Sequence, residues 1–368
     1  MDYRELDTPA LIIDQEKLLD NIRFMQSYAD KNHVTLRPHT KTHKMPYLAK
    51  LQEEYGAKGI AVAKVGEAEV MAANGLKDIF IANEIVGMPK LMRIMELAKT
   101  IDISFGVDSI PQVNMVEEAF EGAEKKAQVL IEIEVGENRS GVIEEKDFID
   151  LVKHIKGCKN INLKGIFSHE GHCYSARDVD HCRELFMESQ RRTLRFAKIT
   201  EELGCKLETV SIGSTPSSMF DFEIMEGITE LRVGTYILMD ASQGNAIGNY
   251  NRCAATVLTT VISRPTEERV ITDVGAKGLT MQTRNKGICA TKGLGVIKGY
   301  KDAYIHEVYD EHAIIYNKEL RDKLKVGDKL EIIPNHICPV CNLYDTAYMV
   351  SQGKVVGEIP ISCRGKLR

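Results

Sequence analysis

The stretch Val34-Thr35-Leu36-Arg37-Pro38-His39-Thr40-Lys41-Thr42-His43-Lys44 opens the part of the chain that decides the fold. Its first residues are typical of a short buried strand, and pairing should fade at Pro38 because proline has no N–H to donate. On an extended segment His39, Lys41 and His43 would point to the same side. A lysine among imidazoles can have its ammonium form disfavoured, and a Schiff base with an aldehyde requires the neutral amine. The competing interpretation is a basic surface turn.

An apolar run followed by polar residues recurs eight times between residues 34 and 240. The predicted strands are Val34–Pro38, Gly59–Ala63, Asp78–Ala82, Asp102–Val107, Gln128–Val135, Leu163–Ser168, Glu208–Ile212 and Glu230–Met239. Longer stretches with helical spacing separate them, for example Ile110–Glu121 and Asp178–Leu203. Eight strands alternating with helices predict an α/β fold, a (β/α)₈ TIM barrel over residues 14–245. A doubly wound sheet is the alternative, but no glycine-rich fingerprint follows an early strand.

The character of the sequence changes after about residue 250, where helical periodicity nearly disappears. The predicted strands there are Ala254–Ser263, Arg269–Asp273, Ala303–Tyr309, His312–Tyr316, Lys329–Pro334, Thr346–Gln352 and Lys354–Ile361. Residues 246–368 are therefore predicted to form a separate, mostly antiparallel β domain. Ala10–Ile13 is also strand-like, and we expect residues 1–13 to pair with the β domain.

Composition excludes several classes of partner. The net charge of −5 gives no general attraction to nucleic acid. No apolar run approaches the roughly 20 residues of a membrane span, and the acidic residues within positions 1–20 are wrong for a targeting peptide. The nine cysteines are an odd number and mostly scattered, which favours free thiols in the cytoplasm over a disulfide framework. A small-molecule ligand remains as the expected partner.

Polar residues follow the predicted strands, at the end of a barrel where reactive groups lie. They are Lys41, Asn83, Asp108, Gly136–Gly141, Ser168–Tyr174, Gly213–Thr215 and Gly234–Tyr236. The segment Gly213-Ser214-Thr215-Pro216 offers backbone N–H groups and two hydroxyls before a helix start, which can bind a phosphate or serve only as a helix cap. A lysine and a phosphate cradle on one barrel predict pyridoxal phosphate.

At this point the chain resembles the fold-type III pyridoxal-phosphate enzymes, the alanine-racemase-like class, and within them the D-threonine aldolase and D-serine dehydratase group. That group's lysine motif, R-P-H-x-K-T-H-K, matches residues 37–44 throughout. Further matches span nearly the whole chain in the expected order: Asp7–Ala10, Glu134–Gly136, Asn138–Val142, Ser211–Pro216, Glu230–Tyr236 and Pro334–Pro339.

The resemblance implies a role for each matching position. Lys41 would form the Schiff base with pyridoxal 5′-phosphate, and Arg139 would donate to the phenolic oxygen of the cofactor. The phosphate would be held by residues 213–215 with backbone groups at positions 234 and 236. The full set assigned to the cofactor is Lys41, His39, Arg139, Tyr174, Gly213, Ser214, Thr215, Gly234 and Tyr236.

A second pair of residues indicates a metal ion. His336-Ile337-Cys338 would place an imidazole and a thiolate on one face of an extended segment, which suits Zn²⁺ first and Mn²⁺ or Mg²⁺ as alternatives. Two protein ligands leave positions open for substrate and water. Cys341 completes a C-x-x-C motif, so a structural zinc or a redox pair is the alternative.

In the resembled family a His-x-Cys pair accompanies dehydratases, and His-x-Asp accompanies many aldolases. We therefore predict a metal-dependent lyase of D-serine dehydratase type that converts a β-hydroxy D-amino acid to a 2-keto acid and ammonia, with Lys41 removing the α-proton. The alternative is a D-threonine aldolase, which gives glycine and an aldehyde; its base would be His172, or else His169. An amino-acid racemase and a non-catalytic cofactor-binding protein are less favoured, because the metal pair and the β domain argue against them. The resemblance also implies a head-to-tail homodimer.

Overall fold

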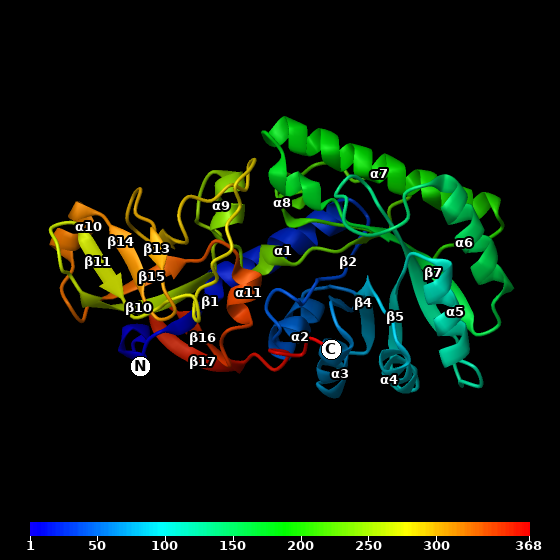
Figure 1. Cartoon of the computed structure of the whole chain (residues 1–368), viewed down its shortest axis with the longest axis horizontal. Helices are drawn as coiled ribbons and strands as arrows, with labels where there is room; N and C mark the ends of the chain where they lie inside the picture. Colours follow the sequence, from blue (N-terminus) through cyan, green and yellow to red (C-terminus); the bar gives the residue numbers. More distant parts are fainter.

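The computed structural model describes the whole chain, residues Met1–Arg368. A barrel of alternating strands and helices lies beside a domain built mainly of strands (Figure 1). The prediction of a TIM barrel with a C-terminal, mostly antiparallel β domain is confirmed. None of the helices combines the length and the apolar character that a membrane span requires.

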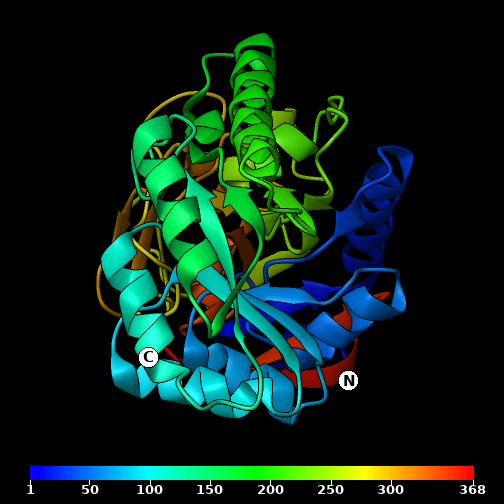
Figure 2. The ribbon, with the colours of Figure 1, turned by 90° about the vertical axis from the view of Figure 1, so that its right-hand side faces the viewer.

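The barrel consists of eight parallel strands in the order β2-β9-β8-β7-β6-β5-β4-β3, with helices around them (Figure 2). The strands are β2 (Thr35–Leu36), β3 (Ile60–Val62), β4 (Asp78–Glu84), β5 (Asp102–Val107), β6 (Ala127–Ile133), β7 (Ile161–Ser168), β8 (Thr209–Ile212) and β9 (Glu230–Leu231). The helices are α1 (Gln15–Lys31), α2 (Pro46–Glu54), α3 (Val65–Ala73), α4 (Met88–Ala98), α5 (Ile110–Ala119), α6 (Glu145–Gly157), α7 (Val179–Glu202) and α8 (Thr215–Ser218).

Sequence signals set the helix boundaries. The carboxylate of Asp178 accepts from the His181 N–H and so caps α7. Helix α7 then turns an apolar stripe that includes Phe186 and Phe196 to the core. Helix α5 begins with a capping box formed by Ser109 and Gln112.

Strand pairing does not stop at Pro38, contrary to the sequence-based expectation. The Pro38 carbonyl accepts from the Ala61 N–H at 2.8 Å, and the Thr40 N–H donates to the Ala61 carbonyl at 2.8 Å. Proline removes only the one hydrogen bond that its missing N–H would have donated, and its carbonyl still accepts. These contacts join β2 to β3 and close the barrel.

The eighth barrel strand is much shorter than predicted. Only Glu230–Leu231 pairs as β9, and the chain then forms a single 3₁₀ turn at Thr235–Ile237. An apolar run of this length does not distinguish a buried strand from a buried turn. The early end of β9 leaves the following loop free to line the mouth of the barrel.

The β domain has its own sheet, in the order β13-β14-β11-β10-β1-β16-β17, with β15 added beside β10 and β12 beside β15. Its strands are β1 (Ala10–Asp14), β10 (Ala255–Ser263), β11 (Arg269–Thr272), β12 (Val296–Ile297), β13 (Glu307–Val308), β14 (Ala313–Tyr316), β15 (Lys329–Ile333), β16 (Thr346–Ser351) and β17 (Lys354–Pro360). As predicted, the N-terminal strand belongs to this sheet: β1 pairs antiparallel with β10 and parallel with β16.

Three short helices of the C-terminal part were not predicted: α9 (Ala241–Ile247), α10 (Lys318–Lys323) and α11 (Ile337–Cys341). Helix α11 lies between the β domain and the barrel (Figure 1). A single apolar core of 86 buried residues runs through both parts, so the β domain packs firmly against the barrel. This packing brings the C-terminal residues of the predicted metal site to the barrel mouth.

Candidate active site

Most of the predicted cofactor residues line one cavity at the C-terminal ends of the barrel strands. The cavity is lined by His39, Lys41, Ala82, Arg139, Phe167, His169, Tyr174, Gly213, Ser214, Thr215, Arg232, Gly234 and Thr235. A larger cleft over the β domain, around Tyr250, Tyr300 and Tyr304, contains none of the predicted site residues. The cavity in the barrel is therefore the candidate active site.

Lys41 lies in the turn that follows β2, beside His39. The Lys41 backbone N–H donates to His39 Nδ1 at 3.4 Å. Burial lowers the pKa of the Lys41 amine; the charge of Cys338 opposes this shift, while Arg139 and Arg232 add to it. Burial, and then the charge of Lys41, hold the pKa of His39 well below its ordinary value. The cavity thus favours the neutral amine that a Schiff base requires.

His43 does not face the cavity, and the prediction that it shares a side with Lys41 is wrong. The chain turns after His39, so the alternation of an extended segment is lost. His43 Nε2 lies 3.2 Å from Gln52 Oε1, and Gln52 Nε2 donates to the Tyr236 hydroxyl at 2.7 Å. The Tyr236 side chain is consequently buried against α2, and Gly234 and Thr235 are the residues of its loop that line the cavity.

The segment Gly213–Thr215 supplies close-packed backbone and one free hydroxyl. Gly213 has φ +151°, and a Cβ there would lie 2.4 Å from the Arg232 carbonyl oxygen, so a side chain is excluded. The Ser214 hydroxyl is engaged with that of Ser217 at 3.0 Å. Thr215 Oγ1 is buried and has no hydrogen-bond partner. An orphaned donor at the wall of the cavity fits a bound phosphate oxygen.

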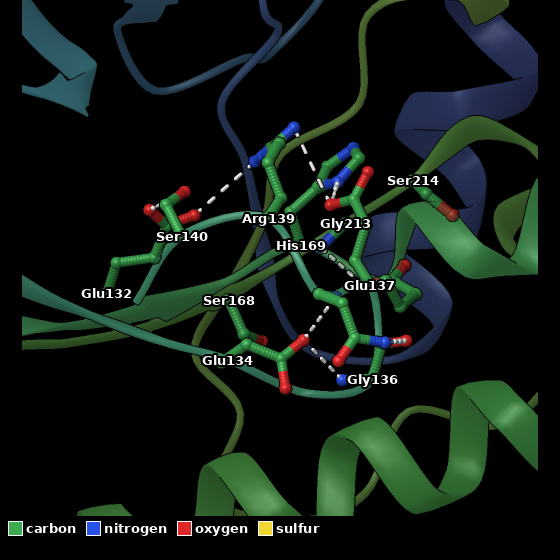
Figure 3. Close-up of polar contacts among 12 residues, drawn as sticks. Glu132, Glu134, Gly136, Glu137, Arg139, Ser140, Ser168, His169, Gly213 and Ser214 are labelled. Atoms are coloured by element: carbon green, nitrogen blue, oxygen red, sulfur yellow. Dashed lines mark hydrogen bonds and ion pairs between the residues drawn. The ribbon is translucent and has the colours of Figure 1, made fainter. Parts of the chain in front are cut away.

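Arg139 projects from the turn after β6 between two glutamates (Figure 3). Its guanidinium lies 3.4 Å from Glu132 and 3.5 Å from Glu137. Glu134 fixes the turn, because its carboxylate accepts from the Gly136 and Asn138 N–H groups at 2.7 Å each. The guanidinium remains about half exposed and can donate into the cavity.

His169 and His172 occupy different places. His169 lines the cavity, and its Nδ1 lies 2.7 Å from Glu137 Oε2 (Figure 3). Burial lowers the pKa of His169 despite Glu137, while burial alone would raise the pKa of Glu137 but His169 and Arg139 lower it. A neutral His169 that donates from Nδ1 keeps Nε2 as a proton acceptor. His172 is absent from the cavity lining and packs close to Gly136.

Arg232 is a cavity residue to which sequence reasoning assigned no role. Its guanidinium donates to Ser211 Oγ at 2.7 Å and to the Ser168 carbonyl at 2.9 Å. The rings of Phe80 and Phe167 stack against it, at 5.7 and 5.1 Å from Cζ to the ring centroids. The signal in the sequence was a charged residue inside an apolar run, where a buried strand would normally exclude it.

The metal pair lies at the start of a helix, so the predicted extended segment is wrong. His336 has φ −143° and precedes α11, and Cys338 is the second residue of that helix. The two side chains nevertheless interact: burial alone would raise the pKa of Cys338, but His336 and the contact with Thr42 lower it to about 7. Cys338 Sγ lies 3.3 Å from Thr42 Oγ1, next to Lys41 along the chain.

The donor set suits a divalent metal ion. His336 Nδ1 is engaged with Gln282 Oε1 at 2.9 Å, which leaves Nε2 for a metal. The protein contains no group of three or more His, Cys, Asp or Glu side chains arranged to hold a metal ion. The structure therefore offers no four-ligand set for a structural zinc around Cys338 and Cys341, whereas a two-ligand site with positions open to substrate is compatible with this geometry.

Asp240 connects the two short helices beside the predicted metal pair. Its two carboxylate oxygens accept from the Gln243 N–H at 2.9 Å and the Ile337 N–H at 3.1 Å, which ties α9 to the start of α11. Burial raises the pKa of Asp240, and the charges of His336 and Arg284 oppose this shift. Both oxygens are thus committed to backbone, and Asp240 serves to position the metal pair.

Comparison with known proteins extends over both parts of the chain. Residues 13–242 match the family described as alanine racemase, N-terminal domain, and residues 254–350 match a serine dehydratase domain. The chain is 32% identical to a D-threonine aldolase from Arthrobacter sp., covering 98% of this chain and 93% of the relative. It is 31% identical to a 3-hydroxy-D-aspartate aldolase from Paracoccus denitrificans, covering 100% and 94%.

Among solved structures, D-threo-3-hydroxyaspartate dehydratase from Delftia sp. superposes with a TM-score of 0.91 at 25% identity, covering 98% of each chain. A D-threo-3-hydroxyaspartate dehydratase with one cysteine replaced by alanine was solved in a metal-free form and superposes with a TM-score of 0.92 at 25% identity, covering 98% of each chain. The resemblance inferred from the sequence is thereby confirmed over nearly the whole length. The chain belongs to the family of the alanine racemase N-terminal domain, as one of its pyridoxal-phosphate-dependent lyases.

Proposed function

We propose that the protein is a lyase that eliminates the β-hydroxyl group of a D-configured β-hydroxy amino acid, giving a 2-keto acid and ammonia. The observation that carries the proposal is the meeting of Lys41 with the His336/Cys338 pair. Cys338 lies within reach of both Thr42, adjacent to Lys41, and Thr235, at 3.3 and 3.7 Å between Sγ and the hydroxyl oxygens. Thr235 lines the cavity that contains Lys41, so the thiol that would bind the metal lies beside the cavity of the carbonyl-reactive amine.

The cavity supports pyridoxal 5′-phosphate as the cofactor. Lys41 would hold its aldehyde carbon, the free Thr215 hydroxyl with the Ser214–Thr215 backbone would hold its phosphate, and Arg139 would donate to its phenolic oxygen. The Gly213 N–H already donates to Glu170 Oε2 at 3.2 Å, so Gly213 would contribute close packing at the cavity wall. Tyr174 and His39 stand at the cavity wall. The chemistry that the cofactor supplies when bound is an electron sink for the charge that develops at Cα.

His336 and Cys338 would hold a divalent metal, in the first place Zn²⁺ and alternatively Mn²⁺ or Mg²⁺. The chemistry that the metal supplies when bound is Lewis-acid polarisation of the β-hydroxyl. A D-threo-3-hydroxyaspartate dehydratase in which one cysteine is replaced by alanine was solved in a metal-free form, which is consistent with a cysteine ligand at a site of this kind. Cys338 occupies the corresponding place in our proposal.

The residues of the chain carry the proton transfers. Lys41, whose amine has its pKa lowered by burial, would take the proton from Cα of the substrate. The Cβ–O bond would break, and the departing hydroxide would take up the proton that Lys41 received and leave as water. The remaining enamine tautomerises to an imine, and hydrolysis of that imine releases the 2-keto acid and ammonia. Arg139 and Arg232 keep the cavity positive, which favours binding of a carboxylate substrate.

Retro-aldol cleavage is the second candidate. Two relatives that share about a third of their residues with this chain are aldolases. This cleavage needs a base on the β-hydroxyl. His169, held through Nδ1 by Glu137, is better placed for that role than His172, because it lines the cavity.

Product analysis tests the proposal. The enzyme is incubated with D-serine, D-threonine and 3-hydroxy-D-aspartate, with and without a chelator, and keto acid plus ammonia is measured against glycine plus aldehyde. We expect keto acid and ammonia, and loss of turnover after chelation. If the products are glycine and an aldehyde, and no substrate gives a keto acid, the protein is an aldolase and the dehydratase proposal is wrong.

A further inference from the structure

We propose that Arg284 binds a carboxylate carried by the β-carbon of the substrate, so that the preferred substrate is a dicarboxylic amino acid of the 3-hydroxy-D-aspartate type. The inference rests on the proposed function of the same site, and it deepens that proposal by naming the substrate class.

Arg284 comes from the β domain and reaches the barrel site. Its guanidinium carbon lies 4.1 Å from the ring centroid of Tyr174, a residue of the cavity wall. Two residues earlier, Gln282 contacts the ring of His336 at 2.9 Å. One short segment therefore touches both the cofactor wall and the metal pair.

The guanidinium of Arg284 has no acidic partner in the chain. Its Nε is buried and makes no hydrogen bond. The nearby carboxylate of Asp240 already accepts two backbone N–H groups. The backbone of Arg284 is fixed by Thr291, whose hydroxyl accepts from the Arg284 N–H at 3.1 Å. A stacked arginine held in place with free donors is prepared to receive a planar anion.

The other cations of the site have partners. Arg139 is shared between Glu132 and Glu137. Arg232 donates to Ser211 Oγ and the Ser168 carbonyl and lies against the rings of Phe80 and Phe167. Of these cations, Arg284 is the one that lies in the segment contacting His336, which places it for an additional substrate anion on the side of the metal pair.

Substrate chemistry locates that anion. The metal held by His336 and Cys338 would polarise the β-hydroxyl, so Cβ would lie close to the metal pair. A carboxylate on Cβ would then come within reach of the segment that carries Gln282 and Arg284. A methyl group or hydrogen at the same place, as in D-threonine or D-serine, would leave the guanidinium without a partner, which costs affinity.

The test compares Arg284→Gln with Lys286→Gln, which removes an exposed positive charge from the same loop. Steady-state kinetics are measured with 3-hydroxy-D-aspartate and D-threonine. We expect Arg284→Gln to lower kcat/KM for 3-hydroxy-D-aspartate by about 30- to 100-fold, the loss of a charge-assisted hydrogen bond, and to change kcat/KM for D-threonine by less than about threefold. Lys286→Gln should leave both unchanged.

A second readout is independent of turnover. Calorimetry measures the binding of succinate, an unreactive dicarboxylate, to the wild type and to Arg284→Gln, and the wild type should bind it more tightly. Equal succinate affinity, or equal kinetic losses for both substrates, would overturn the assignment of Arg284. Turnover of D-threonine or D-serine without turnover of 3-hydroxy-D-aspartate would also overturn it while leaving the lyase proposal intact. Absence of turnover with all three substrates would refute the lyase proposal itself.

Discussion

His43 has both ring nitrogens engaged inside the protein. Nδ1 accepts from the Met45 N–H at 3.0 Å, and Nε2 lies 3.2 Å from Gln52 Oε1. Burial lowers the pKa of His43 to about 4, from an ordinary value of 6.5, because an imidazolium would lose its hydration. The residue therefore fixes the turn that presents Lys41, and it does so only in the neutral form.

This environment predicts a pH-dependent stability. Between about pH 6.5 and about pH 4 the unfolded chain binds a proton at His43 and the folded chain does not. The free energy of unfolding should therefore fall as the pH falls through this window, by about 1.4 kcal/mol per pH unit from this residue, and be fully retained above it. Urea unfolding of the wild type, His43→Gln and the surface control His312→Gln at pH 7, 6 and 5 measures this contribution. The slope should be shallower in His43→Gln alone, and equal slopes in all three proteins would contradict the assignment.

Residues at strand ends were predictable, and residues brought in by long-range packing were not. Lys41 and Arg139 follow apolar strands, and the barrel rule places such positions at the mouth. Arg284 sits in a loop without periodicity, and its meeting with Tyr174 depends on how the β domain docks. His43 was misplaced because the chain turns at residue 40 rather than staying extended.

At the scale of the element, α11 determines the geometry of the metal pair. A run such as His336-Ile337-Cys338-Pro339-Val340-Cys341 is too short for its periodicity to separate strand from helix. Pro339 is compatible with the first turn of a helix, where its missing N–H costs nothing. The helix directs Cys338 toward Thr42 and buries Cys341, a separation that the sequence did not reveal.

The helix therefore predicts different effects for its two cysteines. Cys338→Ala should lower the affinity for Zn²⁺ by more than about 100-fold, since loss of an outer-shell partner alone costs 10- to 100-fold. Cys341→Ala should keep the metal, because Cys341 lies in the apolar core. Metal content after dialysis, with circular dichroism as the folding control, distinguishes the two. Equal zinc in both variants would remove Cys338 from the site, and unfolding of both would restore a structural role for the C-x-x-C pair.

At the scale of the whole molecule, the site is assembled from two parts of the chain. The loops after the barrel strands supply Lys41, Arg139 and the Gly213–Thr215 segment that line the cavity, and the C-terminal part brings Cys338 against Thr42 and Arg284 against Tyr174. The sequence predicted both parts, and it predicted that the strand-like segment Ala10–Ile13 pairs with the second sheet, because alternation patterns are local. The distance between the barrel and the β domain depends on the apolar core that they share, and no local sequence pattern encodes that packing.

We propose that the molecule is a head-to-tail homodimer, because the open barrel mouth would otherwise expose the reaction to water. Light scattering at micromolar concentration should give twice the 41.2 kDa of one chain. Dilution into the monomer range should reduce activity. A monomer that keeps full activity would refute this proposal.

The central claim is that Lys41 is the residue that binds the cofactor and drives the chemistry. The measurement is borohydride reduction of the holoenzyme, which fixes a Schiff base permanently, followed by peptide mass mapping. We expect a reduced pyridoxyl group on Lys41 and no turnover in Lys41→Ala. A label on another lysine, such as Lys44, whose ammonium is already paired with Glu67, would contradict it.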